Sequence, residues 1–164
     1  MKALIVYYSR SGHTAQAADA LKRELDAKGV SVEVLRLHRQ QEASFLGCAF
    51  EARRGAKPAL VELPKDVSGY DLLFLGFPTW AGHASSPANS MVEGIQNVSG
   101  KKCVLFSMSG LKSGFVKALD DIDSSIKSLG GYVVAKQGFS ESERALTAER
   151  AAGLVAKVLG HSGS

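Results

Sequence analysis

The sequence contains few residues of the kinds that build metal centres or disulfide frameworks. Two cysteines stand far apart, outside any C-x-x-C pattern, and four histidines are scattered along the 164 residues. This spacing excludes a recognisable zinc site and predicts reduced thiols in a cytoplasmic protein, one of them in the core. The residues concerned are Cys48, the core Cys103, His13, His38, His83 and His161.

Long hydrophobic runs are also missing. The apolar run near the amino terminus begins at Ala3 and gives way to a polar loop after six residues, too short for a signal peptide or a membrane span. With 45% hydrophobic and 22% charged residues, the composition is that of an ordinary globular protein. We therefore expect no membrane insertion, one domain over residues 1–160, and a frayed tail at 161–164.

Acidic residues are outnumbered, and the net charge is +4 with an isoelectric point near 9.1. The Lys and Arg residues are spread along the chain, and the densest group, residues 36–57, has five of them against two acids. Because this segment contains no recognised nucleic-acid-binding module, we interpret it as a solvated face. The sequence therefore predicts no nucleic-acid partner.

Two common phosphate-binding signatures are missing as well, the Gly-Lys-Ser/Thr ending of a Walker loop and the G-x-G-x-x-G fingerprint. The chain instead begins with a strand, a hydroxyl-rich turn and a helix. Residues 3–8 are apolar or aromatic without interruption, which is typical of a strand buried on both faces of a parallel sheet. After residues 9–14, apolar residues recur at helical spacing up to Gly29, which is placed to end the helix; they are Ala15, Ala18, Leu21 and Leu25.

The turn at residues 9–14 has the composition of an anion site. Ser9, Ser11 and Thr14 offer hydroxyl donors, and Gly12 permits positive φ or a close approach of the backbone. The junction also directs unpaired backbone N–H groups and the positive end of the helix dipole at one small volume. We predict a phosphate here; the alternative is that Ser11 only caps the helix and Thr14 is an ordinary first-turn residue.

The rest of the chain alternates strands with helices, without an internal repeat or a linker. Five strands joined by helical crossovers make a doubly wound α/β fold, a parallel sheet with helices on both faces. The further strands are predicted at residues 30–37 (an edge strand), 71–77, 103–106 and from 132, with helices at 43–54, 87–98, 115–129 and 147–159.

The segment at residues 38–66 has the weakest pattern. The helix at 43–54 is predicted to turn four residues inward, and two prolines are expected to punctuate the return to the sheet. The inward residues are Phe45, Leu46, Ala49 and Phe50, and the prolines are Pro58 and Pro64.

Ligands of such sheets bind outside the carboxyl ends of the strands, where the strand order reverses. That geometry selects three loops, at residues 9–14, 76–90 and 107–114. The second loop contains Trp80, the only tryptophan, which offers a large face for stacking; the alternative is a lid over the end of the sheet. The third loop is rich in Gly and Ser and is either a source of backbone N–H donors or a plain connection.

Together these motifs resemble the flavodoxin-like family. Tyr7-Tyr-Ser-Arg-Ser-Gly-His-Thr14 is similar to its S/T-x-S/T-G-x-T loop, which binds the phosphate of FMN, and Gly76-Phe-Pro-Thr-Trp-Ala-Gly82 is similar to its loop on the isoalloxazine ring. The resemblance implies the strand order 2-1-3-4-5 and non-covalent FMN, with redox chemistry at flavin N5 and no catalytic side chain. It implies that FMN contacts Ser9, Arg10, Ser11, Gly12, His13, Thr14, Pro78, Thr79, Trp80, Ala81, Gly82, Ser107, Met108, Ser109 and Gly110.

The chain departs from the family pattern in ways that bear on function. Flavodoxins that carry electrons are typically acidic, whereas this chain is basic and has Arg10 in its phosphate loop. The third loop lacks the Tyr that many flavodoxins stack on the flavin. Ala81 stands where many have Gly. The resemblance implies that the peptide at this position flips on flavin reduction, so that its carbonyl oxygen accepts from N5–H. The Cβ of Ala81 disfavours the positive φ concerned, so either Gly82 takes over this role or the semiquinone is less stabilised.

Two function classes follow from the resemblance. The first, which we favour as the broad statement, is electron transfer through FMN to a protein partner or a small molecule. The second is an NAD(P)H-dependent quinone or flavin reductase, in which Arg10, His83 or Lys112 supplies positive charge for the pyridine nucleotide. A response-regulator receiver needs an acidic pair after the first strand, and a low-molecular-weight phosphatase needs a Cys in the first loop. The sequence disfavours both, since Tyr8-Ser-Arg10 stands in place of the acidic pair and neither cysteine is near the first loop.

Overall fold

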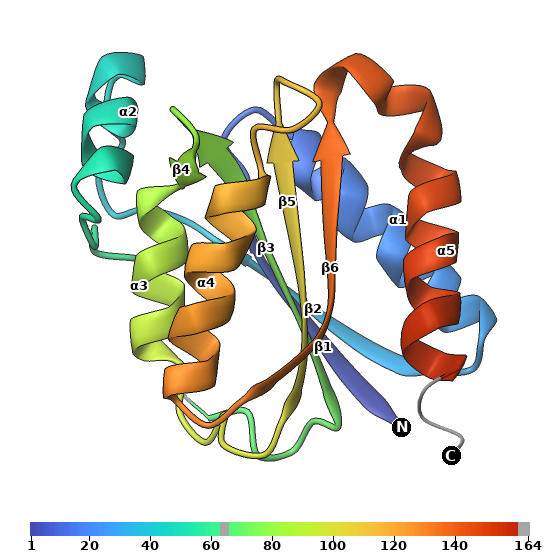
Figure 1. The fold of residues 1–164 in the computed structure, drawn as a ribbon. Coiled ribbons are helices and arrows are strands. Elements are labelled where there is room, and N and C mark those ends of the chain that lie inside the picture. The colour runs from blue at the N-terminus through green and yellow to red at the C-terminus, as the bar shows by residue number, and fades with distance from the viewer. Residues whose placement is uncertain (63–65, 161–164) are drawn as a thin grey trace.

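The computed structural model describes residues 1–62 and 66–160, which form a parallel sheet with helices on both faces (Figure 1). The strand order β2-β1-β3-β5-β6 is the predicted order 2-1-3-4-5, and the doubly wound fold is confirmed. The short β4 pairs antiparallel with β3 and is an addition to the five predicted strands. The strands are β1 (Lys2–Tyr8), β2 (Ser31–Leu37), β3 (Leu72–Trp80), β4 (His83–Ala84), β5 (Lys102–Ser109) and β6 (Tyr132–Ser140).

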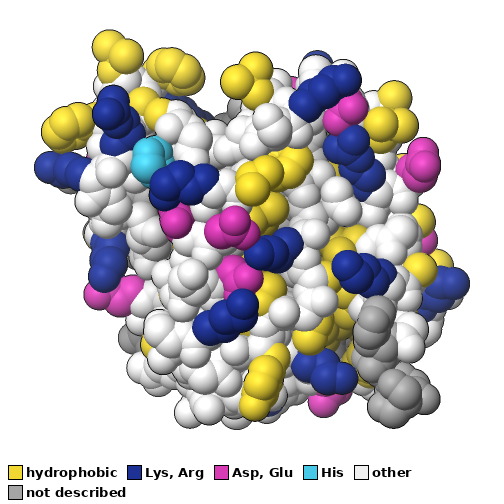
Figure 2. Space-filling model, in the orientation of Figure 1, with side chains coloured by type: hydrophobic (Ala, Val, Ile, Leu, Met, Phe, Trp, Pro, Cys, Tyr) yellow, Lys and Arg dark blue, Asp and Glu magenta, His cyan; other side chains and the backbone are white. Residues whose placement is uncertain are grey.

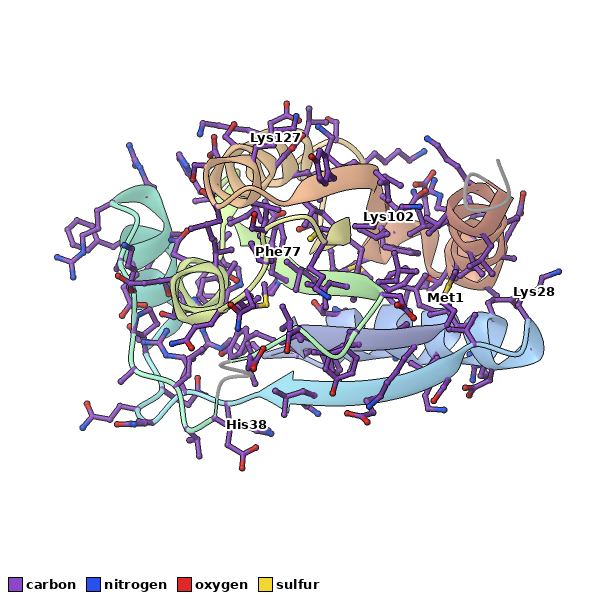
Figure 3. The ribbon with its side chains drawn as sticks, turned by 90° about the horizontal axis from the view of Figure 1, so that it is seen from below. Met1, Lys28, His38, Phe77, Lys102 and Lys127 are labelled. Atoms are coloured by element: carbon purple, nitrogen blue, oxygen red, sulfur yellow. The ribbon has the colours of Figure 1, made fainter. Side chains whose placement is uncertain are left out.

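The helices form two layers, as the view along the sheet in Figure 3 shows, with α1 and α5 on one face and α3 and α4 on the other. A separate apolar core lies under each layer. The smaller α2 lies outside α3, away from the sheet centre. The helices are α1 (His13–Ala27), α2 (Phe45–Arg53), α3 (Ser86–Gly94), α4 (Val116–Ser128) and α5 (Thr147–Gly160), with the 3-10 helix η1 (Glu141–Leu146) before α5.

The strands near the site are longer than predicted. β3 continues to Trp80 because it pairs with β5 as far as Pro78 and then with β4 at Thr79 and Trp80. The loop predicted at 76–90 therefore contains the end of β3, all of β4 and the start of α3. β5 runs to Ser109, into the loop predicted at 107–114, because it pairs with β6 as far as Ser140. Pairing between neighbouring strands therefore overrides the local Gly, Pro and Ser signals.

Several predicted helix signals are confirmed. Gly29, the second residue beyond the end of α1, has φ +76°, and Gly130, the second residue beyond the end of α4, has φ +82°. Pro87 lies in the first turn of α3, where its missing N–H has no helical partner to lose. The predicted tail at 161–164 and the predicted role of Pro64 lie outside the described residues.

The core permits a matched glycine test. Gly76 in β3 faces the ring of Phe106, and a Cβ added there would overlap that ring. We expect Gly76→Ala to lower the free energy of unfolding by about 3 kcal/mol, because both residues lie in central strands and neither can move aside. Gly153 in α5 is exposed, and an added Cβ would meet no described heavy atom within 4 Å. Gly153→Ala should therefore raise the free energy of unfolding by about 0.5–1 kcal/mol. Urea titration of both variants measures these effects, and equal effects of the two changes would contradict this packing.

Candidate functional site

A cavity of about 600 Å³ lies at the carboxyl edge of the sheet, beside the point where β1 and β3 diverge. Its volume is in the range of small-molecule and cofactor sites. Three of its walls come from the loops that the sequence selects, and a fourth comes from α2. It is lined by Arg10, Ser11, His13, Thr14, Phe45, Cys48, Ala49, Pro78, Thr79, Trp80, Ala81, Met108, Gly110 and Glu141.

The structure places the predicted site residues in two groups. Those that line the cavity are Arg10, Ser11, His13, Thr14, Pro78, Thr79, Trp80, Ala81, Met108 and Gly110. The other predicted residues are next to cavity-lining residues in the chain but do not line the cavity themselves. They are Ser9, Gly12, Gly82, Ser107 and Ser109, of which the three serines are buried.

The first loop has the backbone of an anion site. Gly12 adopts φ +92° and is the N-cap of α1, so Ser11 is not the capping residue. Ser11 Oγ instead lies 3.2 Å from His13 Nδ1, while Ser9 Oγ accepts a hydrogen bond from Gly12 N at 3.0 Å. The first-turn amides of a helix have no acceptor within the helix. At this end of α1 they adjoin the cavity, together with the buried hydroxyl of Thr14.

Two arginines connect this loop to neighbouring elements, Arg36 from β2 and Arg10 from within the loop. Arg36 in β2 donates from Nη2 to the carbonyl oxygen of Ser9 at 3.1 Å, and Arg10 Nη1 lies 2.9 Å from Cys48 Sγ. Burial raises the pKa of the Cys48 thiol above its ordinary value, while Arg10 and Arg39 oppose that shift. The thiol is therefore neutral at pH 7, and the positive charge of Arg10 stays available beside the cavity.

Trp80 forms part of the opposite wall. Its ring is half-buried and packs edge-on against Tyr8, with centroids 5.9 Å apart and planes at 86°. Burial, with Glu42 as a second cause, raises the pKa of Tyr8 to about 12, so the phenol stays neutral under the tryptophan.

Trp80 is followed by a tight turn between β3 and β4. Ala81 has φ +50° and Gly82 φ +78°, the two positive values of a type I′ hairpin turn. Ala81 therefore adopts positive φ although its Cβ disfavours it, because the two-residue turn requires positive φ at both positions, at a strain of order 1 kcal/mol for the alanine.

The end of β5 forms the floor. Ser107 Oγ donates to the carbonyl oxygen of Phe77 at 2.8 Å and lies 2.8 Å from Thr79 Oγ1, so its hydroxyl is engaged inside the sheet. Ser109 Oγ accepts from Leu111 N at 3.2 Å and shapes the following loop. Met108 and the backbone at Gly110 are the parts of this segment that reach the cavity.

Sequence reasoning missed the wall formed by α2. This helix buries the small residues Cys48 and Ala52, which permit a close approach to its neighbours, and it turns its larger side chains out. Phe45, Leu46 and Phe50 are 79%, 79% and 64% exposed, so the prediction that they face inward is wrong. Figure 2 shows apolar side chains gathered over α2 at the upper left. Phe45 nevertheless reaches the rim of the cavity, and Ala49 lines it as a smaller residue.

A buried ion pair fixes α2 in place. Both terminal nitrogens of Arg39 donate to the Glu51 carboxylate, at 2.9 and 3.1 Å, and Ser86 Oγ donates to Glu51 Oε2 at 2.7 Å. The hydrogen bonds from Arg39 are the largest cause that lowers the pKa of Glu51. The side chain of Arg39 is 5% exposed, so the interpretation of residues 36–57 as a solvated face is wrong at this position.

Glu141 is the other residue that sequence reasoning missed. It lies directly after β6 and lines the cavity, where its Oε1 is 2.8 Å from His13 Nδ1. Because the carboxyl ends of parallel strands share one edge, the end of the fifth predicted strand was the signal that could have indicated it.

Neither a metal-binding cluster nor a membrane-spanning helix is found among the described residues. The described residues contain no group of three or more His, Cys, Asp and Glu side chains placed to hold a metal ion. None of their helices combines the length and apolar character needed to cross a bilayer.

Comparison with known proteins identifies the family of this chain. Residues 1–145 match the family described as NADPH-dependent FMN reductase. A NAD(P)H dehydrogenase (quinone) from Cupriavidus metallidurans is 34% identical over 86 residues, which are 52% of this chain and 42% of that protein. The match thus spans less than half the length of that relative.

Solved structures show the same fold at low sequence identity. Flavodoxin 2 from Bacillus cereus has a TM-score of 0.68 and 21% identity, covering 98% of this chain and 99% of that one. A flavoprotein in complex with FMN from Lactobacillus acidophilus has a TM-score of 0.66 and 21% identity, covering 87% and 95%. The chain therefore belongs to the NADPH-dependent FMN reductase family, with a flavodoxin-like fold and FMN as its cofactor.

Proposed function

We propose that the protein draws electrons from NAD(P)H and, through FMN held in the carboxyl-edge cavity, delivers them to a small acceptor. The proposal rests on one observation: an anion site and an aromatic wall line the same cavity. The amides of His13 and Thr14 begin α1 at one end, and the ring of Trp80 stands at the other. An FMN molecule has a matching pair of ends, a phosphate and a planar ring.

The residues divide into three groups by the part of FMN they would hold. The phosphate would accept from the loop at 9–14, whose hydroxyls and first-turn amides donate and whose Arg10 adds positive charge. The ring would lie against Trp80, beside Thr79 and the turn at Ala81 and Gly82. Its polar edge would face the backbone of the segment 107–110, since backbone N–H groups stabilise negative charge on a flavin.

Bound FMN supplies the redox chemistry, accepting and releasing one or two electrons. The protein contributes binding, orientation and an accessible face. The family match supports NAD(P)H as the electron donor, and the name of the Cupriavidus metallidurans relative, a NAD(P)H dehydrogenase (quinone), supports a quinone-like acceptor. Positive charge for the pyridine nucleotide would come from Arg10, His83 or Lys112.

A specific observation favours a second candidate, an electron carrier that docks on a protein. Exposed apolar side chains stand near the cavity, from α2 on one side and from Leu111, in the loop after β5, on the other. Grouped apolar side chains on a surface are typical of interaction sites. In this case the donor would be another redox protein and NAD(P)H would be a poor one.

Anaerobic mixing of the holoprotein with NADPH separates these functions. We expect the visible absorbance of the flavin to bleach within seconds, and the same experiment with NADH ranks the two donors. Free FMN with NADPH at the same concentrations is the control for direct reaction. A flavin that stays yellow over minutes while dithionite still bleaches it would reject the reductase and support the carrier.

A further inference from the structure

An acidic side chain stands at the anion end of the cavity. Glu141 Oε1 is 2.8 Å from His13 Nδ1, and the same nitrogen is 3.2 Å from Ser11 Oγ. All three residues line the cavity with Arg10 and Thr14. The carboxylate therefore adjoins the positive groups on which the phosphate of FMN is proposed to bind.

A fixed negative charge at this place works against a phosphate. Like charges repel over several ångströms, and less strongly where water or salt screens them. The phosphate carries between one and two negative charges near pH 7. Glu141 both repels it and occupies His13, a donor that the phosphate would otherwise use.

The neighbouring acid of η1 is arranged differently. Glu143 is flanked by two cations, Arg150 at 2.7 Å and Lys112 at 3.6 Å, and lies outside the cavity lining. Within the described part of the chain, the ion pair of Glu141 is with His13 alone. The side chain of Glu141 is 43% exposed and is not part of the apolar core.

We propose that Glu141 is a specificity-determining residue that competes with the FMN phosphate for His13 and the start of α1. This inference rests on the proposed function and deepens it. Glu141 lowers the affinity for FMN, shortens its residence time, and reduces the preference for FMN over riboflavin, which has no phosphate.

The test compares FMN and riboflavin binding to the apoprotein of the wild type and of Glu141→Gln. The amide keeps an acceptor for His13 but removes the charge. We expect the Kd for FMN to fall roughly tenfold at low salt, from one charge acting on the phosphate across several ångströms. The Kd for riboflavin should stay unchanged, and FMN release by stopped flow should slow by a similar factor. At about 0.5 M NaCl the difference between the two proteins should shrink.

Glu149→Gln is the control for net charge, since Glu149 is an exposed acid in the first turn of α5 and does not line the cavity. Thermal melts of each apoprotein show that it is folded. Three results would overturn the inference: an unchanged or weaker FMN affinity in Glu141→Gln, an equal gain for riboflavin, or an equal gain in Glu149→Gln. The proposed phosphate site fails separately, if the wild type and Glu141→Gln both bind FMN no more tightly than riboflavin.

Discussion

Removing the two cavity-facing hydroxyls of the first loop, by Ser11→Ala together with Thr14→Val, should weaken FMN binding roughly 100-fold. Each hydroxyl is proposed to donate to the charged phosphate, and a hydrogen bond to a charged group contributes about 1.5 kcal/mol or more, close to a factor of ten. Valine keeps the shape of the buried Thr14, so the loss is confined to the hydroxyl. Titration of apoprotein with FMN, followed by flavin fluorescence, measures the effect.

Riboflavin gives this experiment its internal control. Its affinity should be the same for the double variant and the wild type, because it has no phosphate to lose the two donors. The free energy of unfolding of the double variant should also stay close to that of the wild type, since the N-cap of α1 is Gly12 and not Ser11. Ser124→Ala removes a hydroxyl from the outer face of α4 and should leave both affinities unchanged. A matching loss of riboflavin affinity, or a large fall in melting temperature, would show that the hydroxyls are structural.

Glu51→Ala should lower the free energy of unfolding by about 3 kcal/mol. The change leaves the Arg39 guanidinium buried without its carboxylate and also removes the acceptor of Ser86 Oγ. An uncompensated buried charge costs far more than the pair itself contributes, which is why truncating one partner has such a large effect. Urea unfolding measures it.

Glu93→Ala is the matched control, because Glu93 pairs with Lys57 at 3.3 Å and both side chains are more than half exposed. A surface pair of this kind contributes less than about 1 kcal/mol. Similar losses in both variants would contradict the structural role of the Arg39–Glu51 pair.

The same pair predicts how stability depends on pH. The pKa of Glu51 in the folded protein lies below its ordinary value of 4.5, so the unfolded chain takes up a proton first as the pH falls. The stabilisation is fully present above pH 4.5 and is lost as the pH falls through the lower, folded pKa. Glu51→Ala should therefore have a flatter stability curve below pH 4.5 than the wild type.

The alternation of strands and helices and the place of the cavity could be predicted because each depends on local signals that agree, whereas the strand order came from the family resemblance. The uninterrupted apolar run before residue 9, the hydroxyls after it and Gly29 at the end of the helix all indicate one strand–turn–helix unit. Parallel topology then places every other strand end at the same edge, where Trp80 is found. The family resemblance added FMN to an anion site that the residues already indicated.

The remaining features depend on contacts between distant segments. The outward face of α2 follows from its packing through Cys48 and Ala52, and its position follows from the Arg39–Glu51 pair. The extension of β3 and β5 follows from their pairing with each other and with β4 and β6. These contacts join segments far apart in the chain, so a short stretch of sequence does not predict them. The cytoplasmic location and the single domain over residues 1–160 remain predictions.

The most direct measurement of the central claim is a crystal structure of the protein with FMN. The account predicts phosphate oxygens within about 3.2 Å of the amide nitrogens of His13 and Thr14, with the ring against Trp80. A phosphate that points into solvent, or an FMN bound on another face of the sheet while the loop at 9–14 stays free, would contradict it.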